Sequence, residues 1–392
     1  MKKHILLLVV LFSFLGRQKS FAQNMATTEK VYKVAILAPL YLDSVFTNGN
    51  LKYQKTLPRL IMPALEFVQG AQIALDTLSL NGKKVEAHIY DSRSYTRPVS
   101  WLIKNRNLDN MDLLIGSVKE PDYSELAQFA AQKSIPFVSA TYPNDGAIRQ
   151  NPFLVIVNST LKAHCEGIFS YLMQKHGTDN IYLVKKKNDN RIDNYFKEIN
   201  TAEGKPLLKI KTIMLDSSIS SNGLRYLVDT TRPIVIIGAS LDETFSKKLA
   251  DACYPIQKTN PLILIGMPNW DGFKSLVKKD AYKDFPIRYT TPHYDTKNNA
   301  GNFLINKYFQ LYRTKPSDMA QKGFETAYYF INILLNYNTD IMEHLNEDRF
   351  AGFHDFNFRP VYVNKKNNLP DYYENKHLFI MQILNGEIKR EW

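Results

Sequence analysis

Short apolar runs rich in Val, Ile and Leu alternate with longer segments of helical periodicity along almost the whole chain. The first run, VYKVAILAPL (31–40), predicts a strand. Segment 62–80 predicts a helix because its apolar residues recur at helical spacing. The alternation continues with strands predicted over 84–92, 111–117 and 135–140 and helices over 97–107 and 121–134. Strands that are connected through helices run parallel, so this part of the chain predicts a doubly wound α/β sheet.

The same alternation restarts after residue 150, which indicates a second lobe. It predicts strands over 152–158, 180–186, 207–215, 232–240 and 261–267, with a helix over 161–177 and further helices between the later strands. A chain of 392 residues that is 44% hydrophobic and 22% charged is long and apolar enough for two cores. We therefore expect an α/β protein made of two doubly wound parallel-sheet lobes.

The alternation breaks after a strand predicted at 287–294. Two consecutive helices, 302–314 and 319–338, follow with no strand between them, so we expect the chain to return and pack on the first lobe. The tail segments FNFRPVYVN (356–364) and KHLFIMQIL (376–384) predict a final antiparallel pair. The resulting prediction is a first lobe of 24–152 plus 293–350 and a second lobe of 153–292 plus 351–392. A hinge of three crossings is expected near 152–158, 290–296 and 345–358.

The first 23 residues have a different character from the rest of the chain. Lys2 and Lys3 precede the apolar run Ile5–Leu15, and small residues follow at Ser20 and Ala22. A basic N-terminal region, a short apolar stretch and small residues at the expected cleavage site are typical of a secretory signal peptide. The apolar run is too short for a membrane span, although an uncleaved anchor is the alternative. No cysteine lies near the expected cleavage site, so the sequence predicts a periplasmic protein that is not a lipoprotein.

The net charge bears on the expected partners, and the two cysteines bear on whether a disulfide forms. The formal net charge of +12 falls to +8 once the four cations of the first 23 residues are removed. Scattered surface lysines account for this excess, and attraction to an anionic ligand or an anionic envelope surface is the alternative. We expect no nucleic-acid partner. Cys165 and Cys253 each fall in a predicted amphipathic helix, where we expect small apolar fillers, with a single disulfide as the alternative.

Small and hydroxyl-bearing residues stand at the ends of five predicted strands. IPFVSATYPND (135–145) leaves its strand at Ser139, Ala140 and Thr141. The other four ends are Ala38–Tyr41, Gly116–Ser117, Gly238–Ser240 and Gly266–Trp270. Ligands of open α/β sheets bind outside the carboxyl ends of the strands, so these ends predict a cleft between two facing sheets. The alternative is that small residues simply suit tight turns between strands and helices.

The order and content of these segments resemble type I periplasmic binding proteins of the leucine/isoleucine/valine-receptor-like group. The resemblance is carried by VAILAPLYL (34–42), by EFVQGAQIALDTLSLNG (66–82) and by the late helix pair with Pro316 and Gly323. It covers nearly all of the chain after the predicted signal peptide and is most specific over 34–141. The style of 65–78 also resembles an envelope subgroup that is often joined to LysM modules, although this chain shows no such module.

The resemblance implies an exported solute-binding protein that is not an enzyme. It implies ligand contacts at Ser117, Ser139, Ala140 and Thr141, because main chain and hydroxyls hold a ligand carboxylate there in amino-acid receptors. Tyr41 and Trp270 are predicted as apolar walls, and Ser240 and Asn269 as further contacts. The implied partners are a small-molecule ligand and a membrane transporter or other envelope partner.

The second lobe departs from that family pattern. Pro268-Asn269-Trp270 stands where amino-acid receptors usually supply an acidic residue for the ligand ammonium, and Asp271 comes later. An envelope structural or interaction protein that keeps the fold without a transport ligand is therefore the alternative function. The chain contains no GxxxxGK[ST], HExxH, GxSxG or CxxC motif, so we expect no catalytic residue, cofactor or metal. The run Lys185–Lys187 predicts a solvated turn, with attraction of an anionic ligand as the alternative.

Overall fold

The computed structural model describes residues 30–53, 55–80, 82, 84–215, 219–278, 280–293, 299–338, 340–353 and 355–392. The predicted signal peptide and its cleavage site lie outside these residues. No helix within the described ranges has both the length and the apolar character that are needed to cross a membrane.

The first seven-stranded sheet has the order β15-β16-β7-β6-β5-β1-β4. Its strands are β1 (Tyr32–Ala38), β4 (Val85–Asp91), β5 (Leu113–Gly116), β6 (Phe137–Ser139), β7 (Leu154–Ile156), β15 (Phe358–Val361) and β16 (Tyr372–Asn375). All neighbours run parallel except β15, which pairs antiparallel with β16 at one edge. Pro360 lies on that edge strand, where a missing N–H costs no central ladder bond.

Helices cover both faces of this first sheet. One face packs on α3 (Met62–Leu80), α11 (Asn299–Tyr312) and α12 (Asp318–Tyr337), and the other on α4 (Val99–Lys104) and α5 (Asp122–Lys133). Alternate residues of β1 separate cleanly between the two layers: Val34 and Ile36 point into the first, and Ala35 and Leu37 into the second. Both sides of the central strands are therefore buried, which explains their continuous apolar runs.

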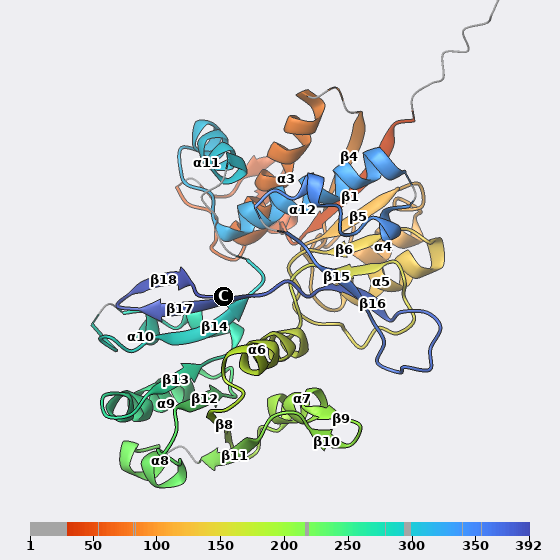
Figure 1. The fold of residues 1–392 in the computed structure, drawn as a ribbon. Helices are drawn as coiled ribbons and strands as arrows, with labels where there is room; N and C mark the ends of the chain where they lie inside the picture. Colours follow the sequence, from red (N-terminus) through yellow and green to blue (C-terminus); the bar gives the residue numbers. More distant parts are fainter. Residues whose placement is uncertain are drawn as a thin grey trace, which may run out of the picture. The chain divides into compact units, whose positions relative to one another are not determined.

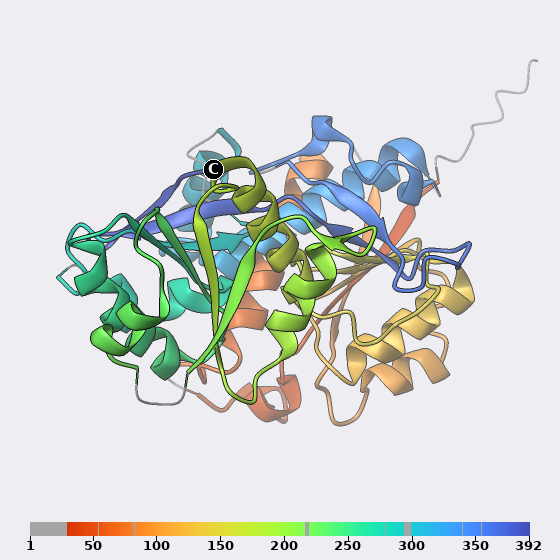
Figure 2. The same cartoon turned by 60° about the horizontal axis from the view of Figure 1, so that its bottom comes forward.

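The late helix α12 crosses α3 at very close range, and the two helices lie side by side in both views (Figure 1 and Figure 2). A Cβ added at Gly70 would lie 1.9 Å from the carbonyl oxygen of Ala320, and one at Gly323 would lie 1.9 Å from that of Phe67. Two glycines thus allow backbone-to-backbone contact. Both late helices, α11 and α12, pack in the core of the first sheet, as the sequence led us to expect.

The second seven-stranded sheet has the order β11-β8-β12-β13-β14-β17-β18. Its strands are β8 (Asn180–Lys186), β11 (Ile210–Leu215), β12 (Ile234–Gly238), β13 (Leu262–Ile265), β14 (Ile287–Thr291), β17 (Phe379–Leu384) and β18 (Glu387–Arg390). Five strands run parallel, and β17 and β18 add an antiparallel edge. The accompanying helices are α6 (Leu161–Lys175), α7 (Arg191–Ile199), α8 (Ser221–Leu227), α9 (Glu243–Gln257) and α10 (Lys274–Val277).

Short elements complete the described fold. They are α2 (Leu42–Val45), the hairpins β2 (Phe46–Thr47) with β3 (Asn50–Leu51) and β9 (Thr201–Ala202) with β10 (Lys205–Pro206), and the 3₁₀ turns η1 (Pro268–Gly272), η2 (Ile341–Glu343) and η3 (Asp348–Phe350). Cys165 and Cys253 are free and buried in the core of the second sheet, so the alternative of a disulfide between them is not formed.

Two assignments of the late and middle strands are wrong. Strand 152–158 was expected in the second lobe, but β7 is a strand of the first sheet. The two tail segments do not pair with each other: β15 pairs with β16 in the first sheet, and β17 pairs with β18 and β14 in the second. The last crossing between sheets thus falls at 376–378 instead of 345–358, and 358–375 belongs with the first sheet. Local periodicity identifies a strand but carries no information on which sheet edge it joins.

Candidate functional site

The backbone N–H groups that follow β1 are hydrogen-bonded to a carboxylate of the protein itself, that of Asp91. The side chain of Asp91 accepts hydrogen bonds from the backbone N–H groups of Leu40 (2.9 Å), Tyr41 (3.0 Å) and Leu42 (2.7 Å). It also accepts from the N–H of Arg93 at 2.9 Å. Such converging N–H groups form an anion-binding concavity, and here Asp91 fills it. Tyr41 adopts left-handed backbone geometry with φ of 52° at this turn.

The hydroxyls predicted as ligand contacts at the neighbouring strand ends are also engaged or buried. Ser117 Oγ and Thr141 Oγ1 lie 3.1 Å apart and hydrogen-bond to each other. Ser139 is 0% exposed, and its hydroxyl has no hydrogen-bond partner among the described residues. Ala140 is equally buried, within the core beneath α3 and α12. The structure therefore corrects the prediction for Ser139 and Ala140, because neither presents an atom to a ligand.

In the second sheet, Trp270 fills the space above two strand ends. It is 0% exposed and belongs to the apolar core. A Cβ added at Gly238 or Gly266 would lie 2.5 Å or 2.0 Å from its ring, so those glycines make room for the indole. The indole Nε1–H donates to the carbonyl of Ser240 at 3.0 Å. The prediction of Trp270 as a cleft wall is thus wrong.

Ser240 is used for local structure as well. It is buried, and its hydroxyl accepts from the backbone N–H of Asp242 at 3.2 Å. This bond closes the turn that leads into α9. The predicted contact at Ser240 is therefore corrected too, and the reason is the same as for Trp270: the strand end satisfies its own polar groups.

A cavity of about 420 Å³ lies where the carboxyl ends of strands from both sheets meet. Loops after β6, β7, β12, β13 and β14 line it, together with α6, α7 and α12. The lining residues are Pro143, Asn144, Asn158, Ser159, Leu161, His164, Arg191, Leu241, Pro268, Asn269, Asp271, Thr291, Pro292, His293 and Lys322. Its volume falls in the usual range of small-molecule sites. Of the eight predicted site residues, only Asn269 lines it.

Part of the wall is held by hydrogen bonds to the strand ends. Asn158 Nδ2 donates to the carbonyl of Thr141 at 2.9 Å, and Ser159 Oγ donates to that of Asn375 at 2.7 Å. These bonds tie the cavity to the predicted region at Thr141, although Thr141 itself does not line it. This part of the wall is therefore held against the first sheet.

His164 forms a buried, uncharged part of the wall. Its Nδ1 hydrogen-bonds with Thr290 Oγ1 at 2.8 Å. Burial, aided by the nearby positive charge of Lys376, lowers the pKa of His164 to about 3. The imidazole is thus neutral at physiological pH.

Asn269 offers an acceptor that the described residues do not use. Its Nδ2 donates to the carbonyl of Leu241 at 2.9 Å, which fixes the amide plane. Its Oδ1 is buried and has no hydrogen-bond partner within the described part of the chain. A buried acceptor without a donor is costly, so this arrangement carries an energetic penalty.

Three charged side chains line the cavity. Arg191 begins α7, and among the described residues no side chain pairs with its guanidinium. Lys322 comes from α12, where burial lowers the pKa of its ammonium against the opposing effect of Asp318 and Asp271. Partial burial of the carboxyl group, together with the negative charge of the nearby Asp318, raises the pKa of Asp271. The residue as a whole is still exposed. The cavity therefore carries cations from both sides and one carboxylate.

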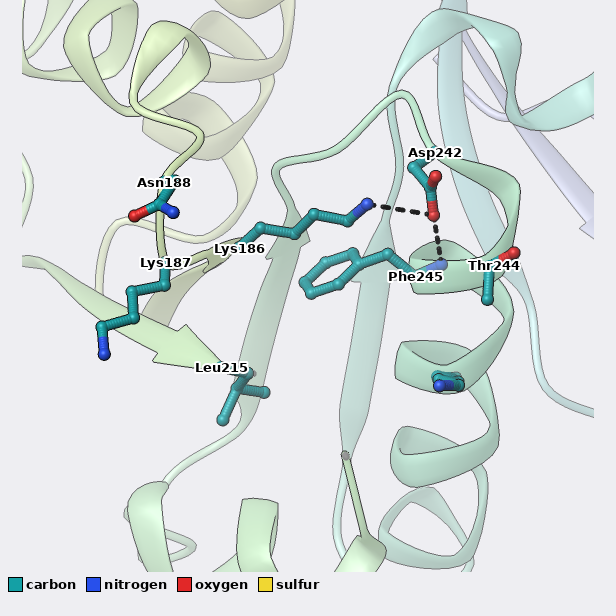
Figure 3. Close-up of a pocket in the computed structure, with 8 residues that line it drawn as sticks. Lys186, Lys187, Asn188, Leu215, Asp242, Thr244 and Phe245 are labelled. Carbon is teal, nitrogen blue, oxygen red and sulfur yellow. Dashed lines mark hydrogen bonds and ion pairs between the residues drawn. The ribbon is translucent and has the colours of Figure 1, made fainter. Parts of the chain in front are cut away.

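A second cavity, of about 320 Å³, lies beside the basic run at the end of β8 (Figure 3). Figure 3 shows Lys186 reaching across it to Asp242, at 3.2 Å, while Lys187 points away. Asp242 also accepts from the N–H of Phe245 at 2.7 Å and so caps α9. Lys185 is buried and paired with Asp193 at 3.1 Å. The lysine run is thus largely structural, and this cavity draws on the second sheet alone.

Within the residues that the structure describes, no group of His, Cys, Asp and Glu side chains is arranged to hold a metal ion. Sequence reasoning missed Arg191, His164 and Lys322, because they lie on helices and not at strand ends. For Arg191, the available signal was its position directly after the Lys185–Asn190 strand end, at the first turn of a helix.

Comparisons with known proteins address the fold. No family model matches this chain, and no curated protein matches it. A protein from Rhodospirillum rubrum, provisionally assigned as a branched-chain amino acid ABC transporter, superposes with a TM-score of 0.64 at 12% identity, covering 92% of this chain and 100% of that one.

Two further solved structures agree. An ABC transporter substrate-binding protein from Desulfitobacterium hafniense, in complex with Leu, has a TM-score of 0.54 at 12% identity and covers 92% of this chain and 100% of its own. A leucine-binding protein from Thermotoga maritima has a TM-score of 0.51 at 14% identity and covers 92% and 98%. With its two seven-stranded α/β sheets, this chain therefore has the fold of the type I periplasmic binding proteins.

Proposed function

We propose that this chain is a solute-binding protein that holds a small polar ligand in the cavity lined by Asn269, Arg191 and Lys322. The observation that carries the proposal is that this one cavity is lined from the carboxyl ends of strands in both sheets. The fold supports it, since solved structures with the same fold include a leucine-binding protein and an ABC transporter substrate-binding protein in complex with Leu.

In this proposal the two sheets belong to two lobes that close on the ligand. The first lobe comprises 30–156 and 299–375, and the second comprises 157–293 and 376–392, with boundaries taken from the strand order. Closure excludes water and strengthens each polar contact with the ligand. Lys322 would approach the ligand from the first lobe and Arg191 from the second.

The proposal includes export and delivery. An exported chain would begin near Asn24 and would hand its ligand to a membrane transporter, as substrate-binding proteins of ABC systems do. The intact mass of protein purified from the native envelope checks this start. A mass that includes residues 1–23 would contradict cleavage.

A second candidate is an envelope interaction protein without a transport ligand. Two observations favour it: Asp91 fills the N–H concavity of the first sheet, and Trp270 fills the space at the strand ends of the second. Positions that could receive a ligand are thus occupied by the protein itself.

A thermal-shift screen separates the two candidates. Small acids, amino acids and sugars would be tested on the wild type, on Asn269→Ala and on Asn188→Ala, which alters the second cavity instead. A ligand present at 100 times its Kd stabilises the folded state by about 2.7 kcal/mol. We expect a ligand that shifts the wild type and Asn188→Ala, and shifts Asn269→Ala much less. A ligand that shifts all three equally would place the site elsewhere, and a screen without any shift would favour the interaction protein.

A further inference from the structure

We infer that the ligand is a small anion rich in hydroxyl or amide groups, held by Arg191 and Lys322, and not an amino acid with an apolar side chain. This inference rests on the proposed function and names its ligand class. Three features support it. Asp91 occupies the N–H groups after β1, the cations Arg191 and Lys322 line the cavity, and amide and hydroxyl groups form part of its wall.

An anion is disfavoured at the end of β1. Asp91 already accepts the hydrogen bonds of Leu40, Tyr41 and Leu42, with distances of 2.9, 3.0 and 2.7 Å. A ligand carboxylate at this turn would find these N–H groups engaged and would be repelled by Asp91. The negative group of a ligand therefore needs another site.

The cavity supplies that site through side chains. Arg191 has no side-chain partner among the described residues, and its guanidinium presents a planar fork that suits a carboxylate or a phosphate. Lys322 enters from α12, on the side of the first sheet. No ion pair joins Lys322 to another described side chain, although Asp318 and Asp271 lie within electrostatic range. Among the lining residues two cations face the single carboxylate of Asp271, while Asp318 and Glu325 lie near Lys322 outside the lining.

The walls combine amide and hydroxyl groups with apolar residues, and so they do not form the wholly apolar pocket that a branched-chain side chain would fill. Asn144, Asn158, Asn269 and Thr291 line the cavity together with the imidazoles of His164 and His293, and no Phe, Tyr or Trp is among the described lining residues. The apolar members of the described wall are Leu161, Leu241, Pro143, Pro268 and Pro292. A ligand with an apolar side chain would leave the amides of Asn144 and Asn158 without a ligand hydrogen bond, and sites built to hydrogen-bond a ligand reject analogues that lack the polar group.

The test uses five probes on the full mature chain, by calorimetry and thermal shift. Gluconate and glucuronate are hydroxylated anions, glucose is hydroxylated but neutral, and leucine and isoleucine carry apolar side chains. We expect the anions to bind and the other three to bind at least tenfold more weakly. Raising the salt concentration should weaken binding of the anions.

Variants then assign the contact. Arg191→Gln and Lys322→Gln should each weaken binding of the anion by about ten- to a hundredfold, because each removes a charged hydrogen bond. Arg191→Lys keeps the charge without the fork, and should retain part of the affinity. Lys187→Gln is the matched control, since Lys187 lines the second cavity, and should bind as the wild type does. Melting temperatures without ligand show whether each variant is folded.

The outcomes are distinguishable. Tight binding of leucine that Arg191→Gln does not weaken would overturn this inference and leave a solute-binding function in place. Binding of glucose as tightly as gluconate would overturn it in the same way. No binding by any of the five probes would count against both the inference and the proposed function.

Discussion

At the residue scale, the hydroxyl of Ser139 was predicted to contact a ligand, but the structure buries it. It is 0% exposed and has no hydrogen-bond partner among the described residues. We predict that Ser139→Ala leaves stability unchanged or raises it by about 1–2 kcal/mol, since a desolvated hydroxyl without a partner is removed. Urea denaturation measures the difference.

Ser159→Ala is the matched control for this change. Ser159 is also fully buried, but its hydroxyl donates to the carbonyl of Asn375 at 2.7 Å. Its loss leaves that carbonyl unpaired and should cost about 1–3 kcal/mol. Equal destabilisation by both variants would show that the Ser139 hydroxyl has a partner after all.

His164 makes stability depend on pH. Burial lowers its pKa to about 3, whereas an unfolded histidine titrates near 6.5. Between these values the unfolded chain binds a proton that the folded chain does not, so stability falls as pH drops from about 6.5 to about 3. The slope contributed by His164 is at most about 1.4 kcal/mol per pH unit.

We therefore predict that His164→Gln loses less stability than the wild type between pH 6.5 and 4. Asp122 has the opposite effect on stability, because burial raises its pKa to about 6 against the opposing charge of Arg93. Asp122 is present in both proteins, so its contribution cancels when their slopes are compared. Denaturant midpoints at several pH values give the two slopes. Parallel slopes would mean that His164 is charged in the folded state.

At the element scale, the crossing of α3 and α12 depends on Gly70 and Gly323. A Cβ at either position would lie 1.9 Å from a backbone oxygen of the opposite helix, far inside contact distance. We predict that Gly323→Ala or Gly70→Ala costs about 1–3 kcal/mol or more, since the helices must move apart. Gly177→Ala, whose Cβ would meet its nearest atom at 3.6 Å, should change stability by less than about 0.5 kcal/mol. Similar denaturation midpoints for all three variants would contradict the close crossing.

Element types were predictable from sequence because they depend on local periodicity. The helix expected over 62–80 is α3, Met62–Leu80, and the strand expected over 180–186 is β8, Asn180–Lys186. Strand partners were not predictable, because β16 and β17 form hydrogen bonds with strands far away in the sequence, β7 and β14. A four-residue apolar run fits either sheet edge equally well.

The candidate site was predictable only in outline. Sequence reasoning placed it at the carboxyl ends of strands and identified Asn269, which lines the cavity. It failed at Trp270, because the sequence does not distinguish a tryptophan that lines a cleft from one that packs in the core. The deciding signal was the pair Gly238 and Gly266, whose missing side chains leave room for that ring. Whether Asp91 would fill its own N–H concavity depends on the folded turn and could not be read from residue types.

At the scale of the whole molecule, an ion-pair network joins the two sheets where the chain crosses for the last time. Lys376 Nζ lies 2.8 Å from Glu166 Oε2 in α6 and 2.5 Å from Glu374 Oε2 in β16. Glu374 is 1% exposed, and its other oxygen accepts from the N–H of Thr160 at 2.7 Å. Burial opposes the charge on Lys376, but the two carboxylates raise its pKa, so the ammonium stays protonated.

We predict that Lys376→Met destabilises the chain by about 3–5 kcal/mol, because it leaves the buried charge of Glu374 without its cation. The double variant Lys376→Met with Glu374→Gln should recover part of this loss, since the uncompensated charge is then gone. Lys162→Met breaks the exposed pair with Glu198, at 2.5 Å, and should cost less than about 1 kcal/mol. Guanidinium denaturation of the four proteins decides the matter. If Lys376→Met cost no more than Lys162→Met, the crossing would be held by packing and backbone bonds, and the charge of Glu374 would be screened by water.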